Sequence, residues 1–133
     1  MNRLRSVGLW VFTLLLSAFF AVQGFVKLAG SPAWVSRFRG WGYPDHFYLV
    51  VGSAELLGAV LLLIPGLARF GALLLMVIMA GAAVTHILHR EPQVMTTIVL
   101  LVLLSLVLYL RRGAAQFWYS GRKINLDVPG VTR

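Results

Sequence analysis

One acidic residue lies deep inside an apolar run, and any chemistry of this chain has to account for it. Glu55 comes eight residues after Phe47, which is about 12 Å along a helix axis. An ionisable side chain in hydrocarbon costs at least about 2.5–3.5 kcal/mol, so it needs a partner or a purpose. Its neighbours along the helix are small residues, which allow another helix to approach closely. These residues are Gly52, Ala54, Gly58 and Ala59. We therefore expect Glu55 to face other helices rather than lipid.

Three polar residues from other apolar runs are candidate partners for this carboxyl group. Gln23 and Lys27 are four residues apart, so they share one helix face, and Gln23 should match Glu55 in depth. Lys27 has a long stem that can either turn inward to Glu55 or extend to the membrane interface. His86 lies near the outer end of a third apolar run.

These four residues support two interpretations. In the structural one, a buried Glu–Gln–Lys network fixes the register of the helices, or a protonated Glu55 bonds to a backbone carbonyl. In the functional one, Glu55, Lys27, Gln23 and His86 line a polar pocket that binds the head of a lipid-soluble ligand. Ligand sites between bundle helices have this combination of an apolar body and a few convergent polar groups. No residue is assigned a catalytic role.

Metal and haem chemistry are not favoured. The chain has no cysteine, which excludes disulfide exchange, iron–sulfur clusters and thiolate sites. His86 and His89 lie on one predicted helix and cannot bind opposite faces of one haem, although His46 and His86 could in principle. No multi-ligand spacing is present, so we expect no metal and no haem. The residues alone identify no cofactor, and transport is weakly supported because only one charge lies deep in a span.

The composition indicates which elements must hold these residues in place. Of 133 residues, 59% are hydrophobic and only 12% are charged, about half the charged fraction of a soluble domain. Lipid must therefore cover the exterior. The net charge of +8 comes from basic residues at the ends of apolar runs, which is typical of membrane topology signals rather than of nucleic-acid binding.

The sequence predicts a single all-α integral membrane domain, 1–133, built as a four-transmembrane-helix bundle. Stretches of about 20 apolar residues cross a bilayer. Turn residues such as Pro65-Gly66 and Pro92 separate the stretches. The expected spans are about 7–28, 47–64, 69–88 and 93–110, followed by a cytoplasmic interfacial tail at 111–133. A cleaved signal peptide is the less favoured interpretation of the first span, because its apolar run is too long.

The connection between the first two spans predicts a short interfacial helix. Ser31-Pro32 is a good helix start, and Trp34, Val35 and Phe38 then fall on one face. We expect this face to lie in the membrane interface.

Basic residues predict the orientation of the chain. Eight lie on one side of the predicted spans and four on the other, so the positive-inside rule places both termini in the cytoplasm. The eight are Arg3, Arg5, Arg69, Arg111, Arg112, Arg122, Lys123 and Arg133, and the four are Lys27, Arg37, Arg39 and Arg90.

The order and spacing of several segments resemble the DoxX family, over roughly the first 90 residues. The segments are Phe20…Gln23-Gly24-Phe25-Val26-Lys27-Leu28, Gly40-Trp41-Gly42-Tyr43-Pro44, Glu55-Leu56-Leu57-Gly58, Leu61-Leu62-Leu63-Ile64, Gly66-Leu67-Ala68-Arg69 and the terminal His86. The resemblance implies a four-helix membrane bundle. The family is named for a subunit associated with thiosulfate:quinone oxidoreduction, and its Lys and Glu positions carry over to Lys27 and Glu55.

The resemblance implies two classes of function. The first is an accessory subunit of a membrane redox system that binds quinone or a similar lipophilic ligand and serves a membrane or periplasmic partner. The second is a non-enzymatic factor that stabilises or assembles another membrane protein. Enzymatic activity stays open. The expected location is a bacterial inner membrane, with the lipid bilayer as the first partner and no nucleic acid. A homo-oligomer is compatible with the sequence.

Overall fold

The structure is a computed structural model that describes residues 3–120, with side chains described through Arg111. Within these residues the chain forms five α-helices and no strand, which confirms the all-α prediction. The helices are α1 (Arg3–Leu28), α2 (Pro32–Gly40), α3 (Phe47–Leu63), α4 (Ala68–Leu88) and α5 (Val94–Ser120).

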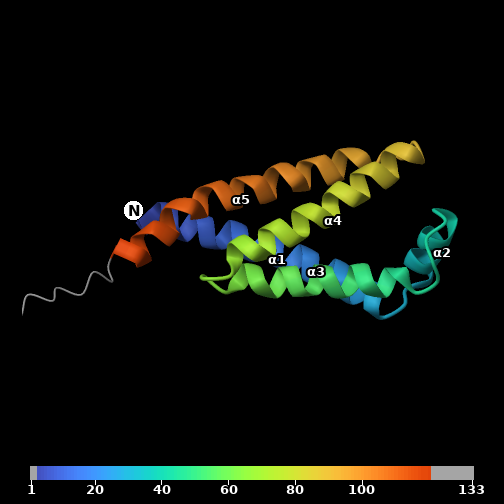
Figure 1. Ribbon diagram of the computed structural model, residues 1–133, viewed down its shortest axis with the longest axis horizontal. Coiled ribbons are helices and arrows are strands. Elements are labelled where there is room, and N and C mark those ends of the chain that lie inside the picture. Colours follow the sequence, from blue (N-terminus) through green and yellow to red (C-terminus); the bar gives the residue numbers. More distant parts are fainter. Residues whose placement is uncertain (1–2, 121–133) are drawn as a thin grey trace, which may run out of the picture.

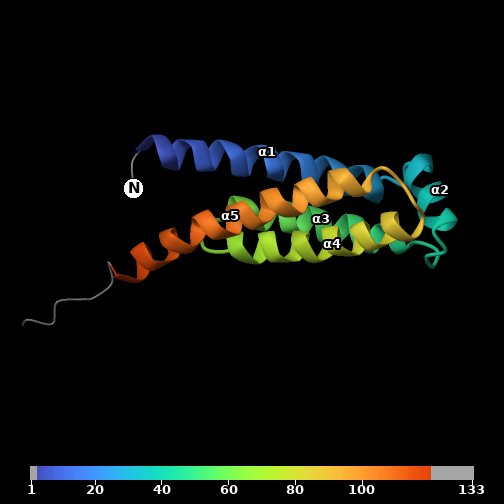
Figure 2. The same ribbon diagram turned by 90° about the horizontal axis from the view of Figure 1, so that it is seen from above.

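The four long helices form two pairs. α1 packs along α3, α3 against α4, and α4 against α5. Short turns return α4 beside α3 and α5 beside α4, whereas the connection from α1 to α3 contains α2. The pair α1–α3 and the pair α4–α5 diverge toward the end of the bundle where α2 lies, here called the α2 end (Figure 1). The start of α1, the α3–α4 turn and the last turns of α5 lie at the opposite end, here called the Arg111 end (Figures 1 and 2).

The hydrophobic core joins the two pairs. Buried side chains from all four long helices meet there, and Phe20, Leu62 and Leu75 are fully excluded from solvent. The cluster comprises Leu16, Phe20, Ala59, Leu62, Ala72, Leu75, Met79, Leu104 and Val107.

Glycines bring the backbones of neighbouring helices into direct contact. A Cβ atom placed on Gly24 of α1 would lie 2.7 Å from the carbonyl oxygen of Gly52 on α3. A Cβ atom on Gly71 of α4 would lie 2.7 Å from the carbonyl oxygen of Gly58. The expectation that small residues around Glu55 pack into the bundle is thus confirmed at Gly52, Gly58 and Ala59, which are buried.

The helices account for part of the predicted membrane topology. Among the described residues, three helices are long and apolar enough to cross a membrane: α1, α4 and the segment Val94–Arg111 of α5. The fourth predicted span, α3, is apolar but only 17 residues long. Large apolar side chains cover the outside of all four helices, including Leu15 (67% exposed), Leu57 (54%), Val77 (70%) and Val102 (61%). Such a surface suits lipid rather than water.

The predicted short helix after the first span is present as α2, but its apolar face differs from the expectation. Phe38 is only 6% exposed, and its ring lies 5.2–6.4 Å from those of Trp41, Tyr43, Phe47 and Tyr48. Phe38 is therefore buried by protein rather than by lipid, because the aromatic start of α3 folds back over it. Trp34 and Val35 are half-buried.

The last helix is longer than its predicted span. α5 continues to Ser120, whereas the sequence predicts a span ending near residue 110 and a separate tail. The remainder of the predicted tail, residues 121–133, lies outside the described residues.

Candidate functional site

The buried acid and base of the sequence form an ion pair at the α2 end of the bundle. Lys27 Nζ lies 2.8 Å from Glu55 Oε2, and each side chain is 4% exposed. The contact exists because Gly24 and Gly52 let α1 and α3 touch one turn away, so that residues 27 and 55 face each other. Lys27 thus turns inward rather than extending to the interface. The carboxyl group of Glu55 bonds to this lysine and to no backbone carbonyl among the described residues.

Trp34 of α2 covers the ion pair from outside. Lys27 Nζ lies 3.9 Å from the centre of the Trp34 ring, and the Arg37 guanidinium lies 5.4 Å from the same ring. A cation that has lost water gains from the negative face of an indole. The short helix therefore contributes directly to the environment of the lysine.

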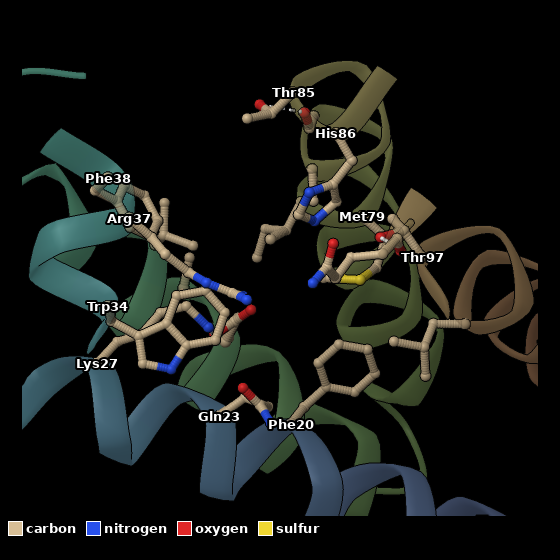
Figure 3. A pocket seen from close by; sticks show the side chains of 18 of the residues that line it. Phe20, Gln23, Lys27, Trp34, Arg37, Phe38, Met79, Thr85, His86 and Thr97 are labelled. Atoms are coloured by element: carbon tan, nitrogen blue, oxygen red, sulfur yellow. Dashed lines mark hydrogen bonds and ion pairs between the residues drawn. The ribbon is translucent and has the colours of Figure 1, made fainter. Parts of the chain in front are cut away.

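A cavity of about 540 Å³ opens beside this ion pair, between the diverging helix pairs. All four residues predicted to bind a ligand line it: Glu55, Lys27, Gln23 and His86. Figure 3 shows Gln23, Lys27, Trp34 and Arg37 on one side of the cavity and His86, Met79 and Thr97 on the other. Most of the wall is apolar, with aromatic side chains from α1, α2, the segment that follows α2 and the start of α3. These aromatic residues are Phe19, Phe20, Trp34, Phe38, Trp41, Tyr43 and Phe47.

Gln23 and His86 do not bond to Glu55. The Gln23 carboxamide lines the cavity and has no hydrogen-bond partner among the described side chains. His86 instead places Nδ1 2.6 Å from Glu91 Oε2. The predicted residues share one cavity but belong to two separate polar clusters.

Glu91 is a member of the site that sequence reasoning missed. It accepts a hydrogen bond from Trp41 Nε1 at 3.0 Å in addition to its contact with His86. The bonds from the Trp41 indole and from His86 hold the pKa of Glu91 below its ordinary value of 4.5. Glu91 thereby links the segment after α2 to α4, across the divergence of the two helix pairs.

The turn after α4 explains this position. The backbone N–H of Glu91 donates to the His86 carbonyl at 2.9 Å, and Arg90 adopts a positive φ of 53°. The reversal returns the Glu91 side chain to the histidine five residues earlier. In the sequence, the charged turn His89-Arg90-Glu91-Pro92 signals only the end of a helix. The only indication of the contact in the sequence is that Glu91 follows His86 by five residues, across this turn.

Further hydrogen bonds complete the wall formed by α4 and α5. Tyr43 Oη lies 2.5 Å from Thr85 Oγ1, which itself donates to the Gly81 carbonyl. Thr97 donates to the Gln93 carbonyl at 3.1 Å. The side-chain oxygen Oε1 of Gln93 is buried without a partner. A buried acceptor in that state is unusual in folded proteins.

The described residues contain no group of three or more histidine, cysteine, aspartate or glutamate side chains that could hold a metal ion. His46, considered above with His86 as a haem ligand, is exposed and does not line the cavity.

Residues 11–108, about three quarters of the chain, match the DoxX-like family. Comparisons with curated proteins and with solved structures gave no match. The matched segment contains the ion pair, the cavity and the cores of all four long helices. The chain therefore belongs to the DoxX-like family, and it is a small helical membrane protein.

Proposed function

We propose that this protein binds a lipid-soluble ligand with a small polar head, of the quinone type, as an accessory subunit of a membrane redox system. One observation carries the proposal. A cavity of about 540 Å³ combines an apolar, largely aromatic wall with a buried Lys27–Glu55 pair and the carboxamide of Gln23. Binding sites for small molecules are typically of this size and composition.

The lining residues suggest how such a ligand would lie. Glu55, Lys27, Gln23 and His86 form the polar part and would contact the head. Half-buried aromatic rings such as Trp34 and Phe47 offer flat surfaces against which a quinone ring can pack. Phe19 and Val77 are 40% and 70% exposed on the outer surface of the helices and also line the cavity. A ligand dissolved in the bilayer could therefore enter sideways, between the helices.

The proposal includes a topology of four crossings. α3 rises about 25 Å at 1.5 Å per residue, near the shortest helices that cross a bilayer, and it packs between α1 and α4. The described ends of the chain lie at the same end of the bundle (Figure 2), as an even number of crossings requires. The basic count favours placing that end in the cytoplasm of a bacterial inner membrane, which would put α2 at the outer interface.

The test is chemical analysis of the purified protein with matched variants. Solvent extraction should release a quinone in stoichiometric amount from the wild type. Ala82 lines the cavity, whereas Ala80 of the same helix is exposed and does not. Ala82→Trp should fill the cavity and lower the bound quinone several-fold, while Ala80→Trp should leave it unchanged.

The opposite outcome favours the assembly factor. Two results together would overturn the ligand-binding proposal. The first is that no quinone can be extracted from the wild type, and the second is that the wild type shows no binding of added quinone that Ala82→Trp weakens. A role in stabilising a partner membrane protein would then be the better explanation of the fold.

A further inference from the structure

Charge is distributed unevenly between the two ends of the bundle. The acidic residues in the described part of the chain all lie toward the α2 end, and they are Asp45, Glu55 and Glu91. The Arg111 end carries arginines at the start of α1, at the start of α4 and in α5. These are Arg3, Arg5, Arg69 and Arg111 (Figure 1). Within residues 3–111 none of these arginines forms an ion pair with an acidic side chain. This end therefore has a positive charge that no described acid balances.

Arg111 differs from the other three arginines because neighbouring side chains fix its position. Its Nη2 donates to Thr13 Oγ1 at 3.1 Å, and its guanidinium group lies 4.6 Å from the centre of the Trp10 ring. Thr13 is fully buried and gives its own hydroxyl proton to the Leu9 carbonyl at 2.7 Å, so its oxygen faces the arginine as an acceptor. The other three arginines are exposed. Arg111 alone is held between helices.

The guanidinium group of Arg111 keeps a donor for a molecule outside the protein. A guanidinium has five N–H donors. Nε of Arg111 is buried and cannot reach a ligand, whereas Nη1 is not buried and meets no acceptor within the described residues. The terminal nitrogen atoms can therefore donate to an anion at the protein surface. Phosphate oxygens match the planar fork of a guanidinium.

The depth of Arg111 in a bilayer suits a phosphate group. The segment Val94–Arg111 is long and apolar enough to cross a membrane, and its ends are about 26 Å apart along the helix axis. This length is close to the hydrocarbon thickness of about 30 Å, so Arg111 would lie beside the headgroups. Tryptophans such as Trp10 are common at that level. Arg3 lies two helical turns before Trp10 on the same face of α1 and adds a second cation farther out.

We propose that Arg111, positioned by Thr13 and Trp10, binds the phosphate group of an anionic phospholipid in the leaflet at the Arg111 end. The phosphate oxygens would accept hydrogen bonds from the terminal nitrogen atoms of Arg111. The unbalanced arginines around the site favour a headgroup with a net negative charge over a zwitterionic one, whose cationic part they repel. The site lies at the opposite end of the bundle from the cavity and does not depend on the proposed function.

The experiment is native mass spectrometry of the full chain in a non-ionic detergent, titrated with phosphatidylglycerol or with phosphatidylcholine of the same acyl chains. Phosphatidylglycerol should bind at least about fivefold more tightly, the equivalent of one favourable charge contact. An excess of inorganic phosphate should not displace it, because the acyl chains also pack on exposed apolar side chains such as Leu14, which is 50% exposed.

Matched variants separate a discrete site from general attraction by positive charge. Arg111→Gln should lower the affinity for phosphatidylglycerol at least about tenfold, because it removes hydrogen bonds from a charged donor. Arg69→Gln removes the same charge at the same end, from an exposed arginine that lies 5.0 Å from the Phe70 ring. It should lower the affinity less than about threefold. Thr13→Val keeps the side-chain shape but releases the guanidinium group, so it should also weaken binding. Arg111→Lys keeps the charge without the fork and should restore only part of the affinity.

Three outcomes would overturn the inference. The first is equal affinity for the two lipids. The second is an equal loss in Arg111→Gln and Arg69→Gln, which would show attraction by net charge alone. The third is full displacement of the lipid by inorganic phosphate, which would assign the site to a free anion. None of these results bears on the ligand of the cavity, which quinone extraction tests separately.

Discussion

At the α2 end of the bundle Lys27 lies 3.9 Å from the ring centre of Trp34, and at the Arg111 end Arg111 lies 4.6 Å from that of Trp10. The lysine is 4% exposed and paired with Glu55. The arginine is half-buried, donates to Thr13 Oγ1 at 3.1 Å and has no acidic partner among the described residues. Its Nε atom is buried without a hydrogen bond.

The difference shows what full burial of a cation requires. Arg111 lies where α1 and α5 meet and its side chain is partly exposed, so water or lipid headgroups can screen its charge. Lys27 has no such exposure, and only a carboxylate buried beside it makes its charge tolerable. A tryptophan accompanies both cations, so the tryptophan alone does not explain the acid. An acidic partner, Glu55, is present only beside the more deeply buried of the two cations, Lys27, among the described residues.

The largest expected effect is the loss of one member of the buried pair. Glu55→Leu and Lys27→Leu should each lower the free energy of unfolding by about 3–5 kcal/mol. The first leaves the Lys27 ammonium group buried without a partner, and the second leaves the Glu55 carboxyl group in that state. The double variant should recover a substantial part of this loss. Equilibrium unfolding in mixed micelles measures all three.

Arg111→Met is the matched control at the other end. It removes one hydrogen bond and keeps an apolar stem, so the expected loss is about 0.5–1.5 kcal/mol. Strictly additive effects of the two leucine substitutions would show that Lys27 and Glu55 are not energetically coupled and would remove the basis of the comparison.

A second prediction concerns the backbone contact that positions Lys27. Gly24→Ala would place a methyl group 2.7 Å from the Gly52 carbonyl oxygen, so α1 must move away from α3, at an expected cost of about 1–3 kcal/mol. Gly8 lies near the other end of α1, where an added Cβ would meet nothing within 4 Å. Gly8→Ala should be neutral or stabilising by up to about 1 kcal/mol, because alanine favours the helix. If Gly24→Ala and Gly8→Ala lowered the free energy of unfolding equally, the close contact of α1 with α3 would not be confined to the end of α1 that carries Lys27.

The smallest expected effect is the pH dependence contributed by Glu91. Its pKa in the folded protein lies below 4.5 because Trp41 and His86 bind the carboxylate. Its stabilising contribution is therefore present above pH 4.5 and is lost as the pH falls through the lower folded value. The stability difference between wild type and Glu91→Gln should be larger at about pH 6 than at about pH 3.5. Thermal melts in buffered detergent at the two values would measure it, and a difference that grows toward low pH would contradict the assigned contacts.

Much of the site could be predicted from the sequence because membrane burial leaves few choices. A lone acid in an apolar run needs a partner, and Lys27 was the base at a suitable depth, so their contact followed from the cost of an unpaired charge. The four predicted lining residues share one cavity because each is a polar residue in the same half of the bundle. Their role in binding a ligand remains a proposal.

What could not be predicted depends on local chain reversal and on the angle between helices. Glu91 reaches His86 only because Arg90 takes a positive φ in the turn, which the pattern of charges does not encode. The position of Phe38 on the apolar face of its helix suits burial in lipid and burial against Phe47 equally well. Sequence periodicity therefore cannot distinguish these two environments. The cavity itself exists because two helix pairs diverge, and hydropathy carries no information on that angle.

The position of the ion pair in the chain bears on how the protein enters the membrane during synthesis. Lys27, Glu55, Trp34 and the two contacting glycines, Gly24 and Gly52, all precede Leu63, where α3 ends. The first two long helices can therefore insert together with their opposite charges already neutralised. α4 and α5 follow without any Asp or Glu in their apolar segments, and they supply the second wall of the cavity. Charge compensation thus comes early in translation, and the cavity is completed by the last helices to leave the ribosome.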